Sequence, residues 1–203
     1  MIAVLDYGIG NLRSAQKALE HVGADARLVT SAAEAEGASG VVLPGVGAFG
    51  RCMEALRATG LDQVTTAAVA SGRPFLGICV GMQLLYEASD EDPGVAGLGL
   101  LPGAVRRLPK GEKHPQMQWN VLDVARPDPM LAGLDAEIWV YFVHSYAPER
   151  SPTGDEVVAT CDYGGPVVAA VRRDNVFATQ FHPEKSGAAG LGMLGNFAAL
   201  CQQ

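Results

Sequence analysis

The sequence predicts an α/β fold: an open, mostly parallel sheet with helices on both faces, and a β-rich second half. Two observations lead to this prediction. In the first half of the chain, short apolar runs alternate with helical patterns, which is typical of parallel strands covered by helices. Of the 203 residues, 48% are hydrophobic, which is enough for one sizeable core, and no long linker interrupts the pattern. We therefore expect a single domain over residues 1–203.

The individual elements follow from this pattern. Residues 2–5, 26–29, 41–43 and 75–78 are predicted strands, and residues 12–22, 48–56 and 61–70 are predicted helices. In the second half, the β-rich runs are 105–108, 138–143, 157–160, 167–171 and 176–181, and residues 188–200 form a glycine-rich helix. Residues 90–102 carry acidic residues, Gly and Pro, and are predicted to be a loop. In open α/β sheets, ligands bind at the carboxyl ends of the strands.

Charge and cysteine usage argue against several kinds of partner. The formal net charge of -7 disfavours nucleic acid and anionic membrane surfaces, which attract basic patches. No apolar run approaches the ~18 residues that span a bilayer. The four cysteines are scattered, without a CxxC pair or metal-type spacing to histidine, so we expect neither a metal nor a cofactor. Residues 1–5 meet Asp6 without a basic leader, and we expect a cytoplasmic protein.

The most informative segment is Gly-Ile-Cys-Val-Gly-Met-Gln at residues 77–83. An apolar run leads into Cys79, and the helix-compatible residues 82–87 follow at once. A strand, a sharp turn and a helix in this order form a nucleophile elbow. Gly77 and Gly81 allow the tight turn, and the helix dipole favours a thiolate at Cys79. The alternative is that Cys79 is a small buried hydrophobe.

Residues 44–50, Pro-Gly-Val-Gly-Ala-Phe-Gly, follow a predicted strand. Their glycines have the spacing of a phosphate-binding loop, but Arg51 and Cys52 stand where that loop needs Lys and then Ser or Thr, which argues against nucleotide binding. Glycine also lets a backbone N–H approach a reacting carbonyl. The N–H groups of Val46 or Gly47 and of Val80 are therefore candidate oxyanion donors. The alternative is an ordinary strand-to-helix turn.

His182, Pro183 and Glu184 supply what a cysteine nucleophile needs. Proline biases His182 toward extended geometry, in which His182 and Glu184 point to the same side. The carboxylate then fixes the tautomer and favours the imidazolium that keeps Cys79 ionised. Alone, this tripeptide is more typical of a surface turn. Together with the elbow, it predicts a Cys79–His182–Glu184 triad for acyl transfer.

These motifs together resemble those of class I (triad-type) glutamine amidotransferases. More narrowly, the chain resembles the glutaminase subunits of histidine biosynthesis, from residue 5 to the C-terminal helix. Four segments carry this resemblance: Asp-Tyr-Gly-Ile-Gly-Asn at 6–11, Pro-Gly-Val-Gly-Ala-Phe at 44–49, Tyr-Phe-Val-His-Ser-Tyr at 141–146, and Gln-Phe-His-Pro-Glu-Lys-Ser at 180–186. The chain departs from the family at Val80, which is usually Leu, and at Gln116 and Gln118, which are usually His and Gly.

The resemblance implies that the chain hydrolyses glutamine to glutamate and ammonia. Cys79 would be the nucleophile, His182 the acid and base, and Glu184 its orienting group. The resemblance also implies a set of glutamine-binding residues: Gly45, Gly47, Gln83, Glu91, His144, Ser145 and Tyr146. From the sequence alone, a solvated loop acid is a comparable interpretation of Glu91.

The resemblance further implies a heterodimer with a (β/α)8-barrel synthase, which takes the ammonia through its interior and forms imidazole glycerol phosphate. Contacts with that partner would fall at Asn11, Trp119, Tyr141 and Lys185. We expect poor glutamine hydrolysis by the isolated chain, because the 44–47 loop is set only when the partner binds its ligand. Three alternatives stay open: a glutaminase subunit serving another acceptor, an elbow-cysteine hydrolase of peptides or small electrophiles, and a non-catalytic regulatory subunit.

Overall fold

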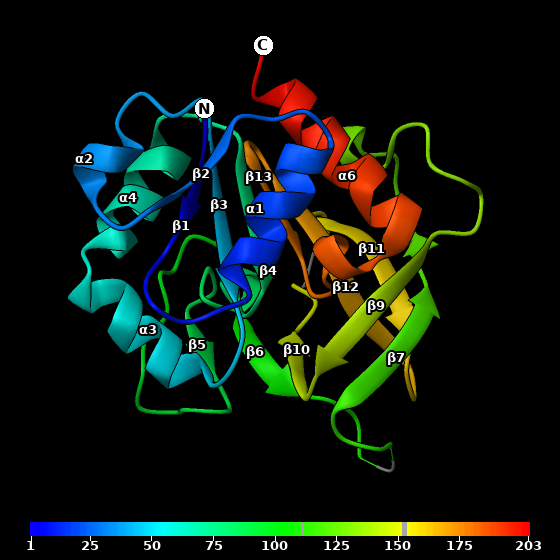
Figure 1. Cartoon of the computed structure of the whole chain (residues 1–203). Coiled ribbons are helices and arrows are strands. Elements are labelled where there is room, and N and C mark those ends of the chain that lie inside the picture. Colours follow the sequence, from blue (N-terminus) through cyan, green and yellow to red (C-terminus); the bar gives the residue numbers. More distant parts are fainter. Residues whose placement is uncertain (111, 152–153) are drawn as a thin grey trace.

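An eight-stranded sheet forms the centre of the molecule in a computed structural model that describes residues 1–110, 112–151 and 154–203 (Figure 1). The strands lie in the order β2-β1-β3-β4-β13-β12-β11-β8. The five strands β2, β1, β3, β4 and β13 run parallel to one another. The next strand, β12, is antiparallel to β13, β11 is antiparallel to β12, and β8 is antiparallel to β11. Their bounds are β1 Ile2–Leu5, β2 Ala26–Val29, β3 Gly40–Gly45, β4 Phe75–Cys79, β8 Asp123–Val124, β11 Val157–Asp162, β12 Pro166–Arg173 and β13 Val176–Thr179.

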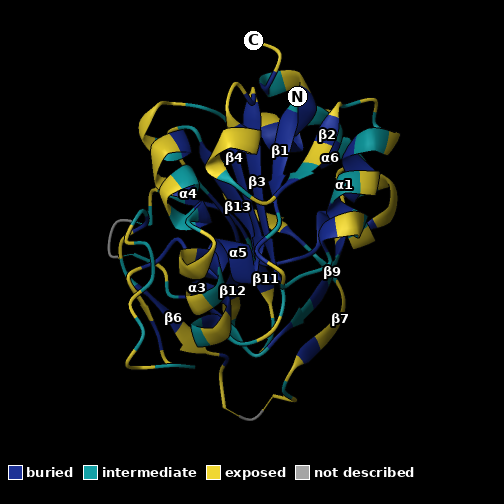
Figure 2. Ribbon diagram, turned by 60° about the vertical axis from the view of Figure 1, so that its left-hand side comes forward, coloured by how far each residue is buried: buried dark blue, intermediate teal, exposed yellow. Residues whose placement is uncertain are grey.

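Helices cover both faces of this sheet. Two of them, α1 (Leu12–His21) and α6 (Gly187–Leu200), lie on one face. On the other face lie α2 (Ala32–Ala35), α3 (Phe49–Ala58) and α4 (Leu61–Ala70), as Figure 2 shows from a second side. Strands β1, β3 and β4 are buried along their whole length, which is the pattern of parallel strands enclosed by helices. The predicted fold class is confirmed.

Two smaller sheets complete the second half. One contains β10 (Tyr146–Pro148), β6 (Ala104–Arg107) and β5 (Ala88–Ser89). The other is an antiparallel ribbon of β7 (Gln116–Val121) and β9 (Trp139–His144), which lies at the lower right of Figure 1. Short helical turns occur at α5 (Val80–Gln83), η1 (Pro129–Leu131) and η2 (Pro183–Lys185). Within the described ranges, no helix is both long and apolar enough to cross a membrane.

One predicted element is wrong. The helix-compatible residues 82–87 form no continuing helix, because α5 ends at Gln83. The carbonyl groups that would extend it accept hydrogen bonds from the loop that follows: Leu98 N donates to Leu84 O over 2.9 Å, and Leu100 N to Leu85 O over 2.8 Å. At Gly97, an added Cβ would overlap the Tyr86 carbonyl oxygen. The predicted loop 90–102 thus occupies the place of the next helical turns.

Candidate active site

Cys79 ends β4 and directly precedes α5, as the elbow prediction requires. Its φ of 55° and ψ of -113° are angles that a non-glycine residue adopts only when its surroundings impose them. Close packing imposes them here, because a Cβ added at Gly81 would overlap the Leu43 carbonyl oxygen on β3. Gly77 and Gly81 are therefore needed for space. The positive φ of the turn falls on Cys79 itself.

The neighbouring strands bring the other predicted residues to Cys79. Gly45, the last residue of β3, is the register partner of Cys79. On the other side, Thr179 ends β13 opposite Ile78, and the chain continues from there to His182. Strand ends that are far apart in sequence thus meet at one edge of the sheet. This is the edge where ligands bind in open α/β folds.

His182 and Glu184 form a buried pair, with each side chain 2% exposed. His182 Nδ1 lies 2.8 Å from Glu184 Oε1, so Nδ1 carries a proton and donates it to the carboxylate. Burial lowers the pKa of His182, but the neighbouring Cys79 sulfur and then the Glu184 carboxylate favour the imidazolium, outweigh this effect and raise the pKa to about 9. At neutral pH, His182 is therefore an imidazolium whose second N–H is available to Cys79.

A cavity of about 250 Å³ lies over Cys79 and His182. This volume is below the ~300–1,000 Å³ typical of drug-sized ligands and suits a small metabolite. The residues lining the cavity are Val46, Gly47, Cys79, Val80, Gln83, Glu91, Pro115, Val143, His144, Ser145, Tyr146 and His182. Every predicted glutamine-binding residue except Gly45 belongs to this lining. Gly45 is not among the lining residues, and a Cβ added there would lie only 2.7 Å from Gly81 N and 2.9 Å from Tyr7 Oη.

The end of β3 and the loop that follows it are anchored through two backbone carbonyl groups. Tyr7 Oη donates to Pro44 O over 2.7 Å, and the Cys52 thiol donates to Val46 O over 3.4 Å. Burial raises the pKa of the Cys52 thiol to about 11, so this thiol stays protonated and remains a donor. The C=O and N–H of a trans peptide point in opposite directions. The Gly47 N–H, which shares its peptide unit with Val46 O, therefore points away from Cys52.

Glu91 and Asp92 attach the 90–102 loop to the start of α3. Glu91 Oε2 accepts from Phe49 N over 2.9 Å, and Asp92 Oδ2 accepts from Gly50 N over 2.7 Å. Two N–H groups that a helix start leaves unpaired are satisfied in this way. Of the two interpretations of Glu91, the structure therefore favours a fixed carboxylate on the cavity wall over a solvated loop acid.

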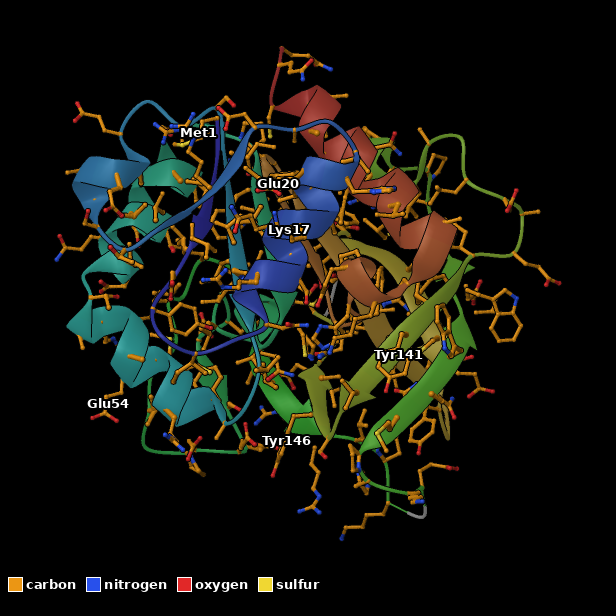
Figure 3. All side chains as sticks on the ribbon, in the orientation of Figure 1. Met1, Lys17, Glu20, Glu54, Tyr141 and Tyr146 are labelled. Carbon is orange, nitrogen blue, oxygen red and sulfur yellow. The ribbon has the colours of Figure 1, made fainter. Side chains whose placement is uncertain are left out.

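Gln83 and His144 meet at the backbone carbonyl of Tyr146, which is labelled in Figure 3. Gln83 Nε2 donates to Tyr146 O over 2.9 Å, and His144 Nδ1 lies 2.8 Å from the same oxygen. Because a carbonyl only accepts, Nδ1 of His144 carries the proton and its Nε2 is an acceptor. Burial lowers the pKa of His144 to about 4. The two histidines of the cavity thus hold different charges at neutral pH.

Three of the predicted partner-contact residues lie together, at the β7–β9 ribbon and η2. Trp119 is 48% exposed, and its ring packs edge-on against Tyr141, with 6.0 Å between ring centroids. Figure 3 labels Tyr141 on β9. Lys185 is exposed on η2. Two residues later, a Cβ added at Gly187 would lie 3.9 Å from the Trp119 ring, so η2 is close to the ribbon. Asn11 precedes α1, which contacts η2.

Several residues of the site were not predicted from the sequence. Gln180 Nε2 donates to Cys79 Sγ over 3.7 Å. Its signal in the sequence is an amide within an otherwise apolar run. Tyr7 and Cys52 bind the carbonyl groups of Pro44 and Val46 through tertiary contacts, which no local sequence pattern indicates.

Comparison with known proteins agrees with this geometry. The glutamine amidotransferase class-I family model matches residues 3–200, and the chain belongs to this family. Its relatives include the imidazole glycerol phosphate synthase subunit HisH of Methanothermobacter thermautotrophicus, 50% identical over 98% of each chain. The subunit of the same name from Deinococcus radiodurans is 48% identical over 97% of this chain and 92% of its own.

Solved structures share the fold. A crystal structure described as a glutamine amidotransferase matches with a TM-score of 0.79 and 25% identity, covering 100% of this chain and 99% of its own. PurLQS from Thermotoga maritima matches with a TM-score of 0.76 over 97% of this chain and 96% of its own, at 22% identity. The second likeness concerns the fold alone.

Proposed function

We propose that this chain is the glutaminase subunit of an imidazole glycerol phosphate synthase and supplies ammonia for histidine biosynthesis. The observation that carries the proposal is the strained Cys79 beside the buried His182–Glu184 pair, in the wall of a cavity of about 250 Å³. The near-full-length likeness to relatives named imidazole glycerol phosphate synthase subunit HisH supports the choice of acceptor. The chain acts as one domain over residues 1–203, in the cytoplasm and without a metal or cofactor.

In the first half of the reaction, the thiolate of Cys79 attacks the side-chain amide carbon of glutamine. A C–S bond forms, and the C–N bond then breaks. His182 gives a proton to the departing nitrogen, which leaves as ammonia, and a γ-glutamyl thioester remains. The negative oxygen of the tetrahedral intermediate is stabilised by the N–H of Val80 and by that of Val46 or Gly47. Loss of one such donor typically slows the reaction about 10²–10³-fold.

In the second half, the now neutral His182 takes a proton from water, and the hydroxide attacks the thioester. The C–S bond breaks, glutamate leaves, and Cys79 and His182 return to their charged forms. Glu184 stabilises the imidazolium at both stages and keeps Nε2 directed at the reacting atoms. Neutral ammonia is the product that a second subunit uses.

Residues around the cavity suit the rest of a glutamine molecule. Glu91 presents a carboxylate to the substrate ammonium, while Phe49 N–H holds it in place. Gln83 and His144, fixed at the Tyr146 carbonyl, line the same cavity together with Ser145 and Gly47. His144 Nε2 offers an acceptor for an N–H of the substrate.

We propose that the partner is a (β/α)8-barrel synthase subunit, that it forms a heterodimer with this chain, and that it docks at Trp119, Tyr141, Lys185 and Asn11. A short path joins this surface to the site: His182 N donates to Tyr141 O over 3.0 Å, and Tyr141 N donates to Ser186 Oγ over 3.0 Å. Contact at Tyr141 therefore acts on the backbone that carries His182. This path supports activation by the partner and slow turnover by the chain alone.

Labelling with 6-diazo-5-oxo-norleucine, an electrophilic glutamine analogue, tests this function. We expect one adduct, on Cys79, which forms faster with the synthase partner and its ligand than with the chain alone. No adduct on Cys79 in the full complex would contradict the proposal and favour a regulatory subunit. Copurification with a different synthase would instead indicate a glutaminase for another acceptor.

A further inference from the structure

Two buried amides connect the cavity wall to the Cys79 sulfur. Gln180 follows β13 and is 0% exposed. Its Nε2 lies 3.7 Å from Cys79 Sγ, and its Oε1 accepts from Gln83 Nε2 over 3.0 Å. Gln83 Nε2 also donates to Tyr146 O over 2.9 Å. The row therefore runs from the Tyr146 carbonyl through the Gln83 amide and the Gln180 amide to the Cys79 sulfur.

The Tyr146 carbonyl sets the direction of every bond in this row. A carbonyl only accepts, so Gln83 must present its nitrogen to it. The same nitrogen requires the oxygen of Gln180, which leaves the Gln180 nitrogen facing the sulfur. Rotating either amide by 180° would place two donors or two acceptors against each other. The network thus fixes an N–H donor, rather than an oxygen, at Cys79.

We propose that Gln180 is a positioning residue for the nucleophile, and that its N–H favours the ionised sulfur of Cys79. An N–H donor is held more strongly by a charged acceptor than by a neutral one, so it favours the thiolate. The inference deepens the proposed function and rests on it for the role of Cys79. The donor also fixes the direction of the sulfur, which the strained backbone at Cys79 presents to the cavity.

Gln180 contributes something that His182 does not. His182 loses its proton to ammonia during acylation and regains it only as water attacks the thioester. The Gln180 amide keeps its N–H groups throughout, because an amide does not titrate in this range. When the thioester breaks, the departing sulfur therefore meets a donor that is already in place. Gln180 acts at the step in which sulfur becomes an anion again.

The titratable groups around Cys79 do not replace this donor. Besides His182, they are Tyr7 after β1, Cys52 on α3, Glu91 in the 90–102 loop, His144 on β9, and Glu184 beyond His182. Burial raises the pKa of Tyr7 and of Cys52 and lowers the pKa of His144, so these three stay neutral at neutral pH. The two carboxylates disfavour a further negative charge on Cys79. Among these titratable groups only His182 favours the thiolate, and Gln180 adds an N–H donor to it.

The test follows the rate of Cys79 alkylation by iodoacetamide against pH, in the full chain, by mass spectrometry of the Cys79 peptide. Gln180→Met keeps the length of the side chain and removes the donor. We expect the whole profile to move about one unit toward alkaline pH, so that alkylation on its acid limb slows about tenfold. The melting temperature should fall by only a few degrees, because Gln83 loses one of its two acceptors and keeps the other. A merely structural role would move the melting temperature and leave the profile in place. The matched control is Gln63→Met on the exposed face of α4, which should change neither.

A second variant and a measurement on the wild type keep the test decisive. Gln180→Glu keeps the shape but, once ionised, places a negative charge at the sulfur, and should be alkylated more slowly than Gln180→Met. In the wild type, the side-chain ¹H–¹⁵N resonances of Gln180 should shift over the same pH range as the alkylation rate. The proposal would be overturned if either variant kept the wild-type pH profile of alkylation. It would also be overturned if the Gln180 resonances did not shift as Cys79 ionises. No arm uses glutamine, so a chain that fails to hydrolyse glutamine would contradict the proposed function without affecting this result.

Discussion

The carboxyl ends of the central strands and the β7–β9 ribbon present opposite kinds of surface. At the strand ends, Cys79, His182 and Glu184 are buried and interact with one another. On the ribbon, Met117, Trp119 and Trp139 are 62%, 48% and 49% exposed. Charged groups are buried only where partners are in place, whereas grouped exposed apolar side chains mark an interaction surface. We infer that this chain holds the Cys79, His182 and Glu184 side chains in place by itself, whereas a partner covers the ribbon and activates the site.

The largest expected effect comes from changing the buried His182–Glu184 pair. Glu184→Gln replaces the carboxylate with an amide, which no longer stabilises the imidazolium and can donate to Nδ1, so that the tautomer changes. We expect glutamine turnover in the complex to fall about 10²–10⁴-fold, measured as glutamate release. Synthesis from added ammonium salt is the control and should persist. Glutamate release within a few-fold of the wild type would remove Glu184 from the mechanism.

The close packing behind Cys79 is tested by Gly81→Ala. The added Cβ would overlap the Leu43 carbonyl oxygen, so strand β3 or the elbow must move. We expect the free energy of unfolding to fall by about 1–3 kcal/mol, by chemical denaturation. Gly94→Ala is the matched control, because nothing lies within 4 Å of its added Cβ. Equal stability of the two variants would mean that the elbow is looser than described.

The ribbon side is tested by Trp119→Ala. Trp119 is half exposed, so we expect the fold to keep its stability while the dissociation constant for the synthase subunit rises about 30-fold. Titration calorimetry with the purified partner measures this. Val124→Ala, an exposed apolar position on β8 of the central sheet rather than on the ribbon, should leave the affinity unchanged. The same loss of affinity in both variants would show that the ribbon is not the docking surface.

The smallest expected effect is the pH dependence that the charge of His182 gives to stability and turnover. The folded pKa of His182, about 9, lies above the ordinary value of 6.5. The imidazolium therefore stabilises the fold fully below about pH 6.5, and this contribution is lost as pH rises through about 9. We expect glutamine turnover to decline tenfold per pH unit above about 9, since the acid that protonates ammonia is then missing. A pH–rate profile of the complex checks this, and a decline centred near 6.5 would contradict it.

Much of the site follows from local sequence. The positions of Cys79, His182 and Glu184 depend on short-range patterns: an apolar run before a cysteine, and a two-residue spacing along an extended chain. Four of the parallel strands, β1, β3, β4 and β13, were predictable for the same reason, because each is a short buried run. These features need no knowledge of distant contacts.

The rest depends on contacts that form only in the folded chain. Helix α5 stops after one turn because residues 97–101 take its next carbonyl groups. The row from Tyr146 through Gln83 and Gln180 joins residues from three distant parts of the chain. Strand β7 was not predicted either. Gln116, buried at its start, reaches Cys161 Sγ over 3.7 Å, a partner that only the fold provides.

The central claim is that Cys79 releases ammonia for a second subunit. The most direct test is a Cys79→Ala chain in complex with the synthase subunit, supplied in turn with glutamine and with ammonium salt. We expect glutamine-dependent synthesis to be lost and ammonia-dependent synthesis to continue at the wild-type rate. Loss of both activities, in a complex that still assembles, would contradict it, because Cys79 would then serve something other than the supply of nitrogen.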